Sequence, residues 1–321
     1  MSASPPTPPS ERLEGGGRIV RALSAMLFPL LLLACGADVP QPSQSAPAAD
    51  AVQADEPESE ARAAEPAAPA APEPAAERAY DAPTEQPAFY GLRVVRTYPH
   101  DRASFTQGLF FADGALFEST GKRGASRIRR LDLRTGDALA EVSLPDEVFG
   151  EGATVVGDRI VSLSWREGLG FVHDLATLEQ EGTFPLEGEG WGLAYDEVAE
   201  RLILSDGTDT LRFLNPETFE ETGSVAVTLG DRPLPQLNEL EWVDGEVWAN
   251  VWQQEAIVRI DPETGAVRGV VDVSGLYPPQ DRADPRDDVP NGIAYEPRSG
   301  RLFLTGKRWP QIFEVELDPR G

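Results

Sequence analysis

Five short segments of this chain repeat one pattern, in which a strand, a tight turn and a second strand follow one another. They are QGLFFADGALFEST (107–120), EGATVVGDRIVSLSW (151–165), WGLAYDEVAERLILSD (191–206), NELEWVDGEVWANVW (238–252) and NGIAYEPRSGRLFLTG (291–306). Similarity that recurs at about 40–50 residues is typical of the blades of a β-propeller. The repeats therefore predict an all-β fold, a five-bladed β-propeller.

The segments between the hairpins supply further strands. Each hairpin is followed by a third strand such as RIRRLDL or TLRFLN, and the first four units add a fourth, such as ALAEVSL or VRGVVDV. The fifth unit has no fourth strand, whereas an unpaired strand at 91–98 precedes the first hairpin. We expect this N-terminal strand to complete the last blade, because ring closure removes exposed sheet edges. No helix of any length is expected.

The repeat also predicts a ring of functional side chains. Equivalent positions of the inner strands meet around the propeller axis, so the first position of the repeat brings together Gln107, Glu151, Trp191, Asn238 and Asn291. One carboxylate, three carboxamides and an indole are typical of a site rather than of packing.

A second layer follows from the outgoing strands of the same hairpins. Aligned on their apolar pairs, these strands place at one equivalent position Gly121, Trp165, Gly207, Trp252 and Lys307. The glycines leave room, the indoles form walls and the lysine supplies positive charge. A single tryptophan in a β-protein is more often a core residue, but three indoles near one mouth favour a site.

Glu151 is the residue that we expect to carry the chemistry. It lies in the stretch FGEG (149–152), at the start of an inner strand. A carboxylate among indoles loses hydration, which raises its pKa toward a value useful in general acid–base catalysis. The alternative is a glutamate that only accepts hydrogen bonds from backbone groups in the channel.

Residues 1–36 have the pattern of an export signal. Arg18 and Arg21 precede a mostly apolar run at 25–34, and Cys35 follows it. The run is shorter than the roughly 20 apolar residues of a membrane span. The stretch LLAC (32–35) resembles a bacterial lipobox, in which the cysteine is lipid-modified. We expect an exported lipoprotein, anchored to a membrane through Cys35 and facing the periplasm or the cell exterior; the alternative is an ordinary signal peptide with an incidental cysteine.

The rest of the chain divides into a linker and one domain. Residues 37–88 consist mostly of Ala, Pro, Glu and Gln, with Tyr80 as the only aromatic residue. Such a segment cannot bury enough apolar surface to fold, so we expect a disordered, extended tether. Residues 89–321 are long enough for one domain with a single core. Cys35 is the only cysteine, so this domain has no disulfide and depends on packing.

Charge and composition exclude several classes of function. A net charge of −26 disfavours nucleic acid as a partner, because the phosphate backbone requires clusters of Lys and Arg. His100 and His173 are the only histidines, and the chain has neither HExxH nor a cysteine pair, so a catalytic zinc ion would lack ligands. No GxSxG motif indicates a serine nucleophile. We expect no metal and no cofactor.

The motifs, taken in order, resemble the plant-type glutaminyl-peptide cyclotransferases, also called glutamine cyclotransferases, which have bacterial members. The resemblance spans 90–318, and it is carried by FTQGL (105–109), ESTGKRGASRIR (118–129), FGEG (149–152), GWGL (190–193), LNELEWVDGEVWANVWQ (237–253), NGIAY (291–295) and LTGKRWP (304–310). It implies a five-bladed propeller and a metal-independent enzyme. Arg123 departs from the family pattern, which favours Tyr there.

The resemblance also implies a reaction and a set of site residues. The α-amine of an N-terminal glutamine attacks its own side-chain amide, ammonia leaves and pyroglutamate remains. Glu151 is then the acid–base residue. The substrate's polar groups are held by Gln107, Asn238 and Lys307, and the pocket walls are Phe105, Phe149, Trp165, Trp191 and Trp252.

Two other functions remain open at this point. One is a non-catalytic propeller that binds peptides or surface partners. The other is a five-bladed glycosidase or lactonase, for which Glu118, Glu151 and Asp206 could supply carboxylates. The partners that we expect are peptides or proteins with an N-terminal glutamine and, through a lipid anchor only, a membrane. We expect a monomer.

Overall fold

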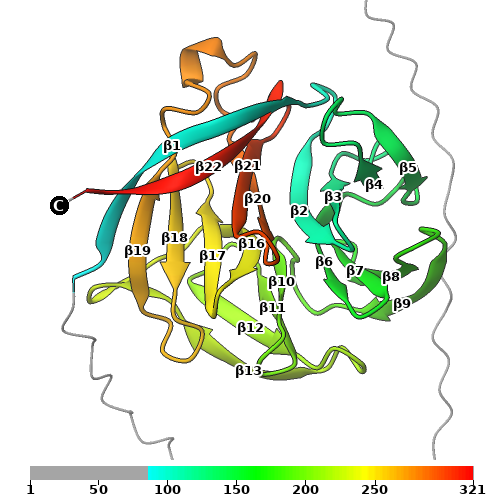
Figure 1. The fold of residues 1–321 in the computed structure, drawn as a ribbon. Helices are drawn as coiled ribbons and strands as arrows, with labels where there is room; N and C mark the ends of the chain where they lie inside the picture. Colours follow the sequence, from blue (N-terminus) through cyan, green and yellow to red (C-terminus); the bar gives the residue numbers. More distant parts are fainter. Residues whose placement is uncertain (1–85, 321) are drawn as a thin grey trace, which may run out of the picture. The chain divides into compact units, whose positions relative to one another are not determined.

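The computed structural model describes residues 86–320, which form an all-β propeller of five blades around one axis (Figure 1). The first blade holds β2 (Thr106–Ala112), β3 (Ala115–Thr120), β4 (Arg127–Leu131) and β5 (Ala138–Ser143). The second holds β6 (Gly150–Val156), β7 (Arg159–Ser164), β8 (Leu169–Asp174) and β9 (Gln180–Pro185). The third holds β10 (Leu193–Asp196), β11 (Arg201–Ser205), β12 (Thr210–Leu214) and β13 (Glu221–Ala226).

The remaining two blades share one continuous sheet. The fourth holds β16 (Leu237–Val243), β17 (Glu246–Val251), β18 (Ala256–Ile260) and β19 (Val267–Asp272). The fifth holds β20 (Pro290–Glu296), β21 (Arg301–Gly306), β22 (Gln311–Arg320) and β1 (Ala88–Pro99). A short hairpin of β14 (Thr228–Leu229) and β15 (Arg232–Pro233) was not predicted. The described residues contain one helix, the three-residue 3-10 turn η1 (Pro279–Asp281). The prediction of five blades without long helices is confirmed.

The hairpin turns follow from their sequences. In the first and fourth blades the turn is Asp-Gly, and both residues have positive φ: 50° and 76° at Asp113 and Gly114, 48° and 91° at Asp244 and Gly245. Positive φ at both central residues defines a type I′ turn, whose twist matches that of the flanking strands. The Asp-Gly pairs therefore set the register of these two inner hairpins.

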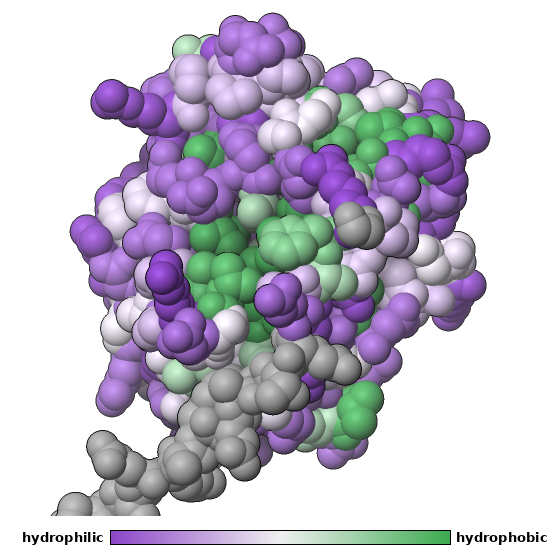
Figure 2. Space-filling model, turned by 90° about the vertical axis from the view of Figure 1, so that its left-hand side faces the viewer, coloured by the Kyte–Doolittle hydropathy of each residue, from purple (hydrophilic) through white to green (hydrophobic). Residues whose placement is uncertain are grey.

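The N-terminal strand closes the ring, as predicted. β1 pairs antiparallel with β22 from Phe89 to Pro99, so it is the fourth strand of the last blade. The first residues of β1 also pair in parallel with β19 of the fourth blade, which was not predicted. Figure 2 shows the side of the molecule where β1 and β19 lie, with apolar side chains gathered among polar ones. The exposed Phe89, Val94 and Val95 belong to β1.

Glycines near the axis allow the inner strands to approach closely. A Cβ on Gly192 would lie 2.0 Å from the carbonyl oxygen of Asn238 on the neighbouring blade. The fourth hairpin has Glu239 where the others have glycine, and its buried carboxylate spans the axis. It accepts hydrogen bonds from the backbone N–H of Leu109 (3.2 Å) and of Ile293 (2.9 Å), which joins the first and fifth blades.

The predicted export signal at 1–36 lies outside the described residues, as does the predicted linker up to residue 85. Within residues 86–320, no helix is long and apolar enough to cross a membrane.

Candidate active site

A pocket of about 260 Å³ opens at one end of the propeller axis. Its lining residues are Phe105, Gln107, Lys122, Phe149, Glu151, Trp165, Trp191, Asn238, Trp252, Asp287 and Lys307. The structure therefore brings together in one cavity all the propeller residues that the sequence singled out as catalytic or substrate-binding. Lys122 and Asp287 are additional members.

The hairpin geometry explains why these residues meet. In an antiparallel pair the start of the first strand lies beside the end of the second. Phe149 and Trp165 show this pairing, since the Trp165 N–H donates to the Phe149 carbonyl at 3.0 Å. The inner hairpins of the first, second, fourth and fifth blades also shift register at the site positions. Such irregularities re-aim side chains.

Glu151 sits at the base of the pocket with 5% of its surface exposed. Burial raises its pKa well above the usual value, and the nearby carboxylates of Glu167 and Glu189 act in the same direction. Lys307 and Lys122 oppose this rise without cancelling it. A carboxyl in this environment can hold a proton at a pH where an exposed glutamate cannot.

Lys307 follows β21 and is buried beside Glu151. Burial lowers its pKa to about 8, although the charge of Glu151 favours its protonated form. Its ammonium nitrogen lies 4.8 Å from the centre of the Phe105 ring, a distance typical of a cation–π contact. Lys307 thus presents an ammonium group with little hydration in the pocket.

The pocket walls are two groups of aromatic rings. Phe149 packs against Trp165 with ring centres 5.6 Å apart, and Trp191 packs edge-on against Trp252 at the same separation. Trp252 lies at the rim, with 36% of its surface exposed. These contacts give the pocket rigid apolar sides.

The two glycines of the second layer do leave room, as predicted, and the rings of Phe149 and Trp191 fill it. A Cβ on Gly121 would lie 2.4 Å from the Phe149 ring. A Cβ on Gly207, whose φ is +82°, would lie 2.6 Å from the Trp191 ring.

Asn291 is the one member of the predicted ring that does not line the pocket. It is fully buried, and its side-chain amide donates to the carbonyl of Thr106 at 3.0 Å and to Oε1 of Gln107 at 3.1 Å. With its oxygen engaged in this way, Gln107 keeps its NH2 group as a donor for a ligand. Asn291 therefore orients the Gln107 side chain from outside the pocket.

The pocket rim contains charges that the sequence analysis missed. Lys122 lies 3.7 Å from the centre of the Phe105 ring and forms an ion pair with Asp287 at 3.1 Å. Asp287 also pairs with Arg308 at 2.8 Å. It belongs to the acidic connection between β19 and β20. Lys122 lies in the ESTGKRGASRIR motif, which was the available signal.

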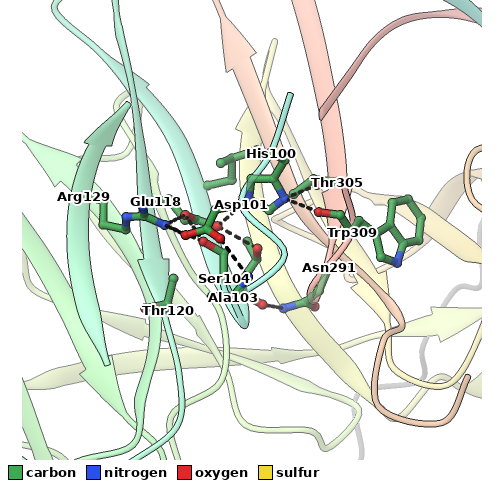
Figure 3. A network of polar contacts seen from close by, with 12 residues as sticks. His100, Asp101, Ala103, Ser104, Glu118, Thr120, Arg129, Asn291, Thr305 and Trp309 are labelled. Atoms are coloured by element: carbon green, nitrogen blue, oxygen red, sulfur yellow. Dashed lines mark hydrogen bonds and ion pairs between the residues drawn. The ribbon is translucent and has the colours of Figure 1, made fainter. Parts of the chain in front are cut away.

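Behind Phe105 lies a buried polar network that the sequence did not reveal (Figure 3). The Glu118 carboxylate accepts hydrogen bonds from Ser104 (2.9 Å) and Thr106 (2.7 Å), the two neighbours of Phe105. It also contacts His100 at 2.9 Å, and the other ring nitrogen of His100 lies 2.8 Å from the Trp309 carbonyl. Glu118 and His100 thus tie the segment before β2 to the segment that follows Lys307.

Other carboxylates named from the sequence are not in the pocket. Glu118 is fully buried within its network, and Asp206 bonds the backbone and hydroxyl of Thr208. Neither Glu118 nor Asp206 therefore stands in the pocket as a partner of Glu151 in the carboxylate pair of a glycosidase. Arg123, which departs from the family pattern, lies in the loop after β3 and donates to Glu167 of the second blade.

Within residues 86–320, no three His, Cys, Asp or Glu side chains are close enough together to hold a metal ion.

Three comparisons with known proteins show which proteins this chain resembles. The family model of glutamine cyclotransferase matches residues 66–317. Glutaminyl-peptide cyclotransferase from Arabidopsis thaliana is 42% identical over 229 residues, which cover 70% of this chain and 71% of that protein. The crystal structure of Myxococcus xanthus glutaminyl cyclase matches with a TM-score of 0.70 at 40% identity, covering 74% of this chain and 100% of that one.

Proposed function

This chain belongs to the glutamine cyclotransferase family and converts the N-terminal glutamine of peptides to pyroglutamate with release of ammonia, and we propose that Glu151 performs the proton transfers. The observation that carries the proposal is the buried Glu151 carboxyl, whose pKa is raised at the base of an aromatic pocket.

The first step needs a neutral α-amine on the substrate. The unperturbed pKa of such an amine is about 7.7–8.0, so a moderate decrease of this pKa leaves the amine neutral, with its lone pair available for attack. The nitrogen attacks the amide carbon of the glutamine side chain, a C–N bond forms and the amine must lose a proton. Glu151 in its ionised form accepts that proton, directly from the attacking nitrogen.

The second step is the departure of ammonia, which is a poor leaving group. The protonated Glu151 returns the proton to the leaving nitrogen, the original C–N bond breaks and ammonia leaves. Between the two steps the carbonyl oxygen carries negative charge. Lys307 and the side-chain amides of Gln107 and Asn238 are the donors that stabilise this oxyanion.

The aromatic walls contribute by shaping the substrate. The rings of Phe149, Trp165, Trp191 and Trp252 hold the glutamine side chain folded toward its own amine, which raises the fraction of reactive conformers. They also exclude water, which would otherwise compete with the amine. Incubating the purified protein with a Gln-initiated peptide tests this function: ammonia should appear, and the peptide should lose the mass of one ammonia.

The first prediction concerns metal ions. The reaction proposed above uses only side chains of this protein, so incubation with a strong chelator should leave the rate of cyclisation unchanged. Activity that disappears on chelation and returns with added zinc would overturn the proposal. A lower melting temperature with unchanged activity would instead indicate a structural ion.

The second prediction concerns cellular location. We propose that the protein is exported and anchored through a lipid on Cys35, because LLAC (32–35) resembles a lipobox. Cys35→Ser should then move the protein from the membrane fraction to the soluble periplasm or the medium. Gly36 follows the cysteine, which in Gram-negative bacteria favours the outer membrane. Unchanged fractionation of Cys35→Ser would reject the anchor.

A further inference from the structure

Glu189 connects two walls of the pocket that come from different blades. Its Oε2 accepts a hydrogen bond from the indole N–H of Trp165 at 2.8 Å and one from the indole N–H of Trp191 at 3.0 Å. Its other oxygen, Oε1, accepts from Nε of Arg166 at 2.7 Å. Trp165 follows β7 of the second blade and Trp191 precedes β10 of the third, so one carboxylate sets the position of both rings.

This arrangement engages the whole hydrogen-bonding capacity of the two indoles. An indole has a single donor and no acceptor, and here both donors converge on one oxygen. Bonds from neutral donors to an ionised acceptor are stronger than bonds between neutral groups. The guanidinium of Arg166 lies 3.9 Å from the centre of the Trp165 ring, which holds that ring from a second direction. The two walls are therefore held by polar contacts at the rim as well as by packing.

Glu189 also acts on Glu151 through its charge. Burial alone would raise the pKa of Glu189, but the bonds from Trp191, Arg166 and Trp165 offset this and lower it, so the carboxylate stays ionised. Among the charged groups near Glu151, Lys307 and Lys122 favour its ionised form, whereas Glu167 and Glu189 favour its protonated form. Asp287 lines the same pocket and is paired with Lys122 and Arg308.

We propose that Glu189 is a positioning residue for the cyclisation, because its carboxylate holds Trp165 and Trp191 as walls of the glutamine pocket and places a negative charge near Glu151. The inference rests on the role proposed above for Glu151. Glu189 does not line the pocket and reaches the substrate only through these other residues.

The test compares two substitutions that separate the hydrogen bonds from the charge. Glu189→Ala removes both, so kcat/KM for a Gln-initiated peptide should fall roughly 10- to 100-fold, largely through KM. Glu189→Gln keeps an oxygen that can accept from both indoles, so its KM should rise by only about threefold. The side chain is 32% exposed, and we expect both variants to fold, with thermal melting as the check.

The pH profile of kcat/KM supplies a readout that a purely structural role would not move. The first step needs a neutral substrate amine and an ionised Glu151, so kcat/KM should rise with pH through two limbs, one that belongs to the amine and one that belongs to Glu151. Glu189→Gln removes a charge that favours protonated Glu151, so the limb that belongs to Glu151 should move to lower pH. Glu167→Gln is the matched control: it removes a similar charge, but Glu167 bonds Arg123 and no indole. It should move the same limb and leave KM unchanged.

Glu187→Gln, an exposed change in the same segment, should alter neither the limb nor KM. In a Trp191→Phe background, which lacks one of the two donors, Glu189→Ala should cost less than it does in the wild-type protein.

Two results would overturn the inference: a KM within twofold of wild type in Glu189→Ala, or an unmoved limb in Glu189→Gln. Glu151→Gln, assayed in parallel, separates this failure from that of the underlying proposal. If Glu151→Gln retains normal turnover, the acid–base assignment fails. The KM of Glu189→Ala and its effect in the Trp191→Phe background would still test whether Glu189 positions the walls.

Discussion

Replacing Glu151 with glutamine should lower turnover by about two to four powers of ten, the usual contribution of a positioned acid–base group. The substitution keeps the shape of the side chain and its capacity to accept a hydrogen bond, but removes the proton that titrates. KM should change much less, because the aromatic walls, Gln107 and Asn238 remain in place. Steady-state ammonia release from a Gln-initiated peptide measures both quantities.

The same variant should fold as well as the wild-type protein or slightly better. A carboxylate with 5% exposure loses most of its hydration, and a neutral amide avoids that cost. Glu118→Gln is the comparison, because Glu118 does not line the pocket, and its effect on turnover should be smaller when measured well below its melting temperature. Near-normal turnover in Glu151→Gln together with lost turnover in Glu118→Gln would show that the assignment is wrong.

Replacing Glu118 with alanine should lower the free energy of unfolding by about 3–5 kcal/mol, the cost of removing one partner from a buried ion pair. The change leaves His100 and the hydroxyls of Ser104 and Thr106 without their acceptor, and it leaves Arg129 without one of its carboxylate partners. Denaturant unfolding of the purified protein gives the value. Glu147→Ala, at an exposed position in the connection between the first and second blades, is the control and should stay within about 0.5 kcal/mol of wild type.

The pair of Glu118 and His100 also predicts how stability depends on pH. Burial alone would lower the pKa of His100, but the Glu118 carboxylate more than offsets this and raises it above 6.5. Burial alone would raise the pKa of Glu118, but His100, Thr106 and Arg129 lower it below 4.5. The Glu118–His100 ion pair therefore makes its full contribution to folding stability between about pH 4.5 and 6.5.

Outside that window one partner loses its charge. As pH rises through the raised pKa of His100 the stabilisation is lost, and as pH falls through the lowered pKa of Glu118 it is also lost. The difference in unfolding free energy between wild type and Glu118→Ala should be largest inside the window. A difference that is independent of pH would contradict an ionic contribution.

The structure shows which parts of the site were accessible to sequence reasoning. Glu151, Trp191 and Asn238 could be grouped because they occupy one position of a repeat, and equivalent positions meet at the axis. Asn291 shares that position but bonds to Gln107 instead of lining the pocket. The repeat thus predicts where a residue stands in the ring but not which direction its side chain takes.

The sequence by itself determined the five hairpins, the closure by the N-terminal strand and the residues that meet at one mouth, because strand alternation and turn chemistry are local and the repeat imposes approximate symmetry. Only the tertiary structure revealed the contacts that break this symmetry. Glu189 bonds Trp165 of the second blade, Asp287 reaches Lys122 of the first, and β1 pairs with β19 as well as β22. Each of these contacts joins segments of different blades, or a connection between two blades, and forms only when the blades pack together, so no local pattern in the chain encodes it.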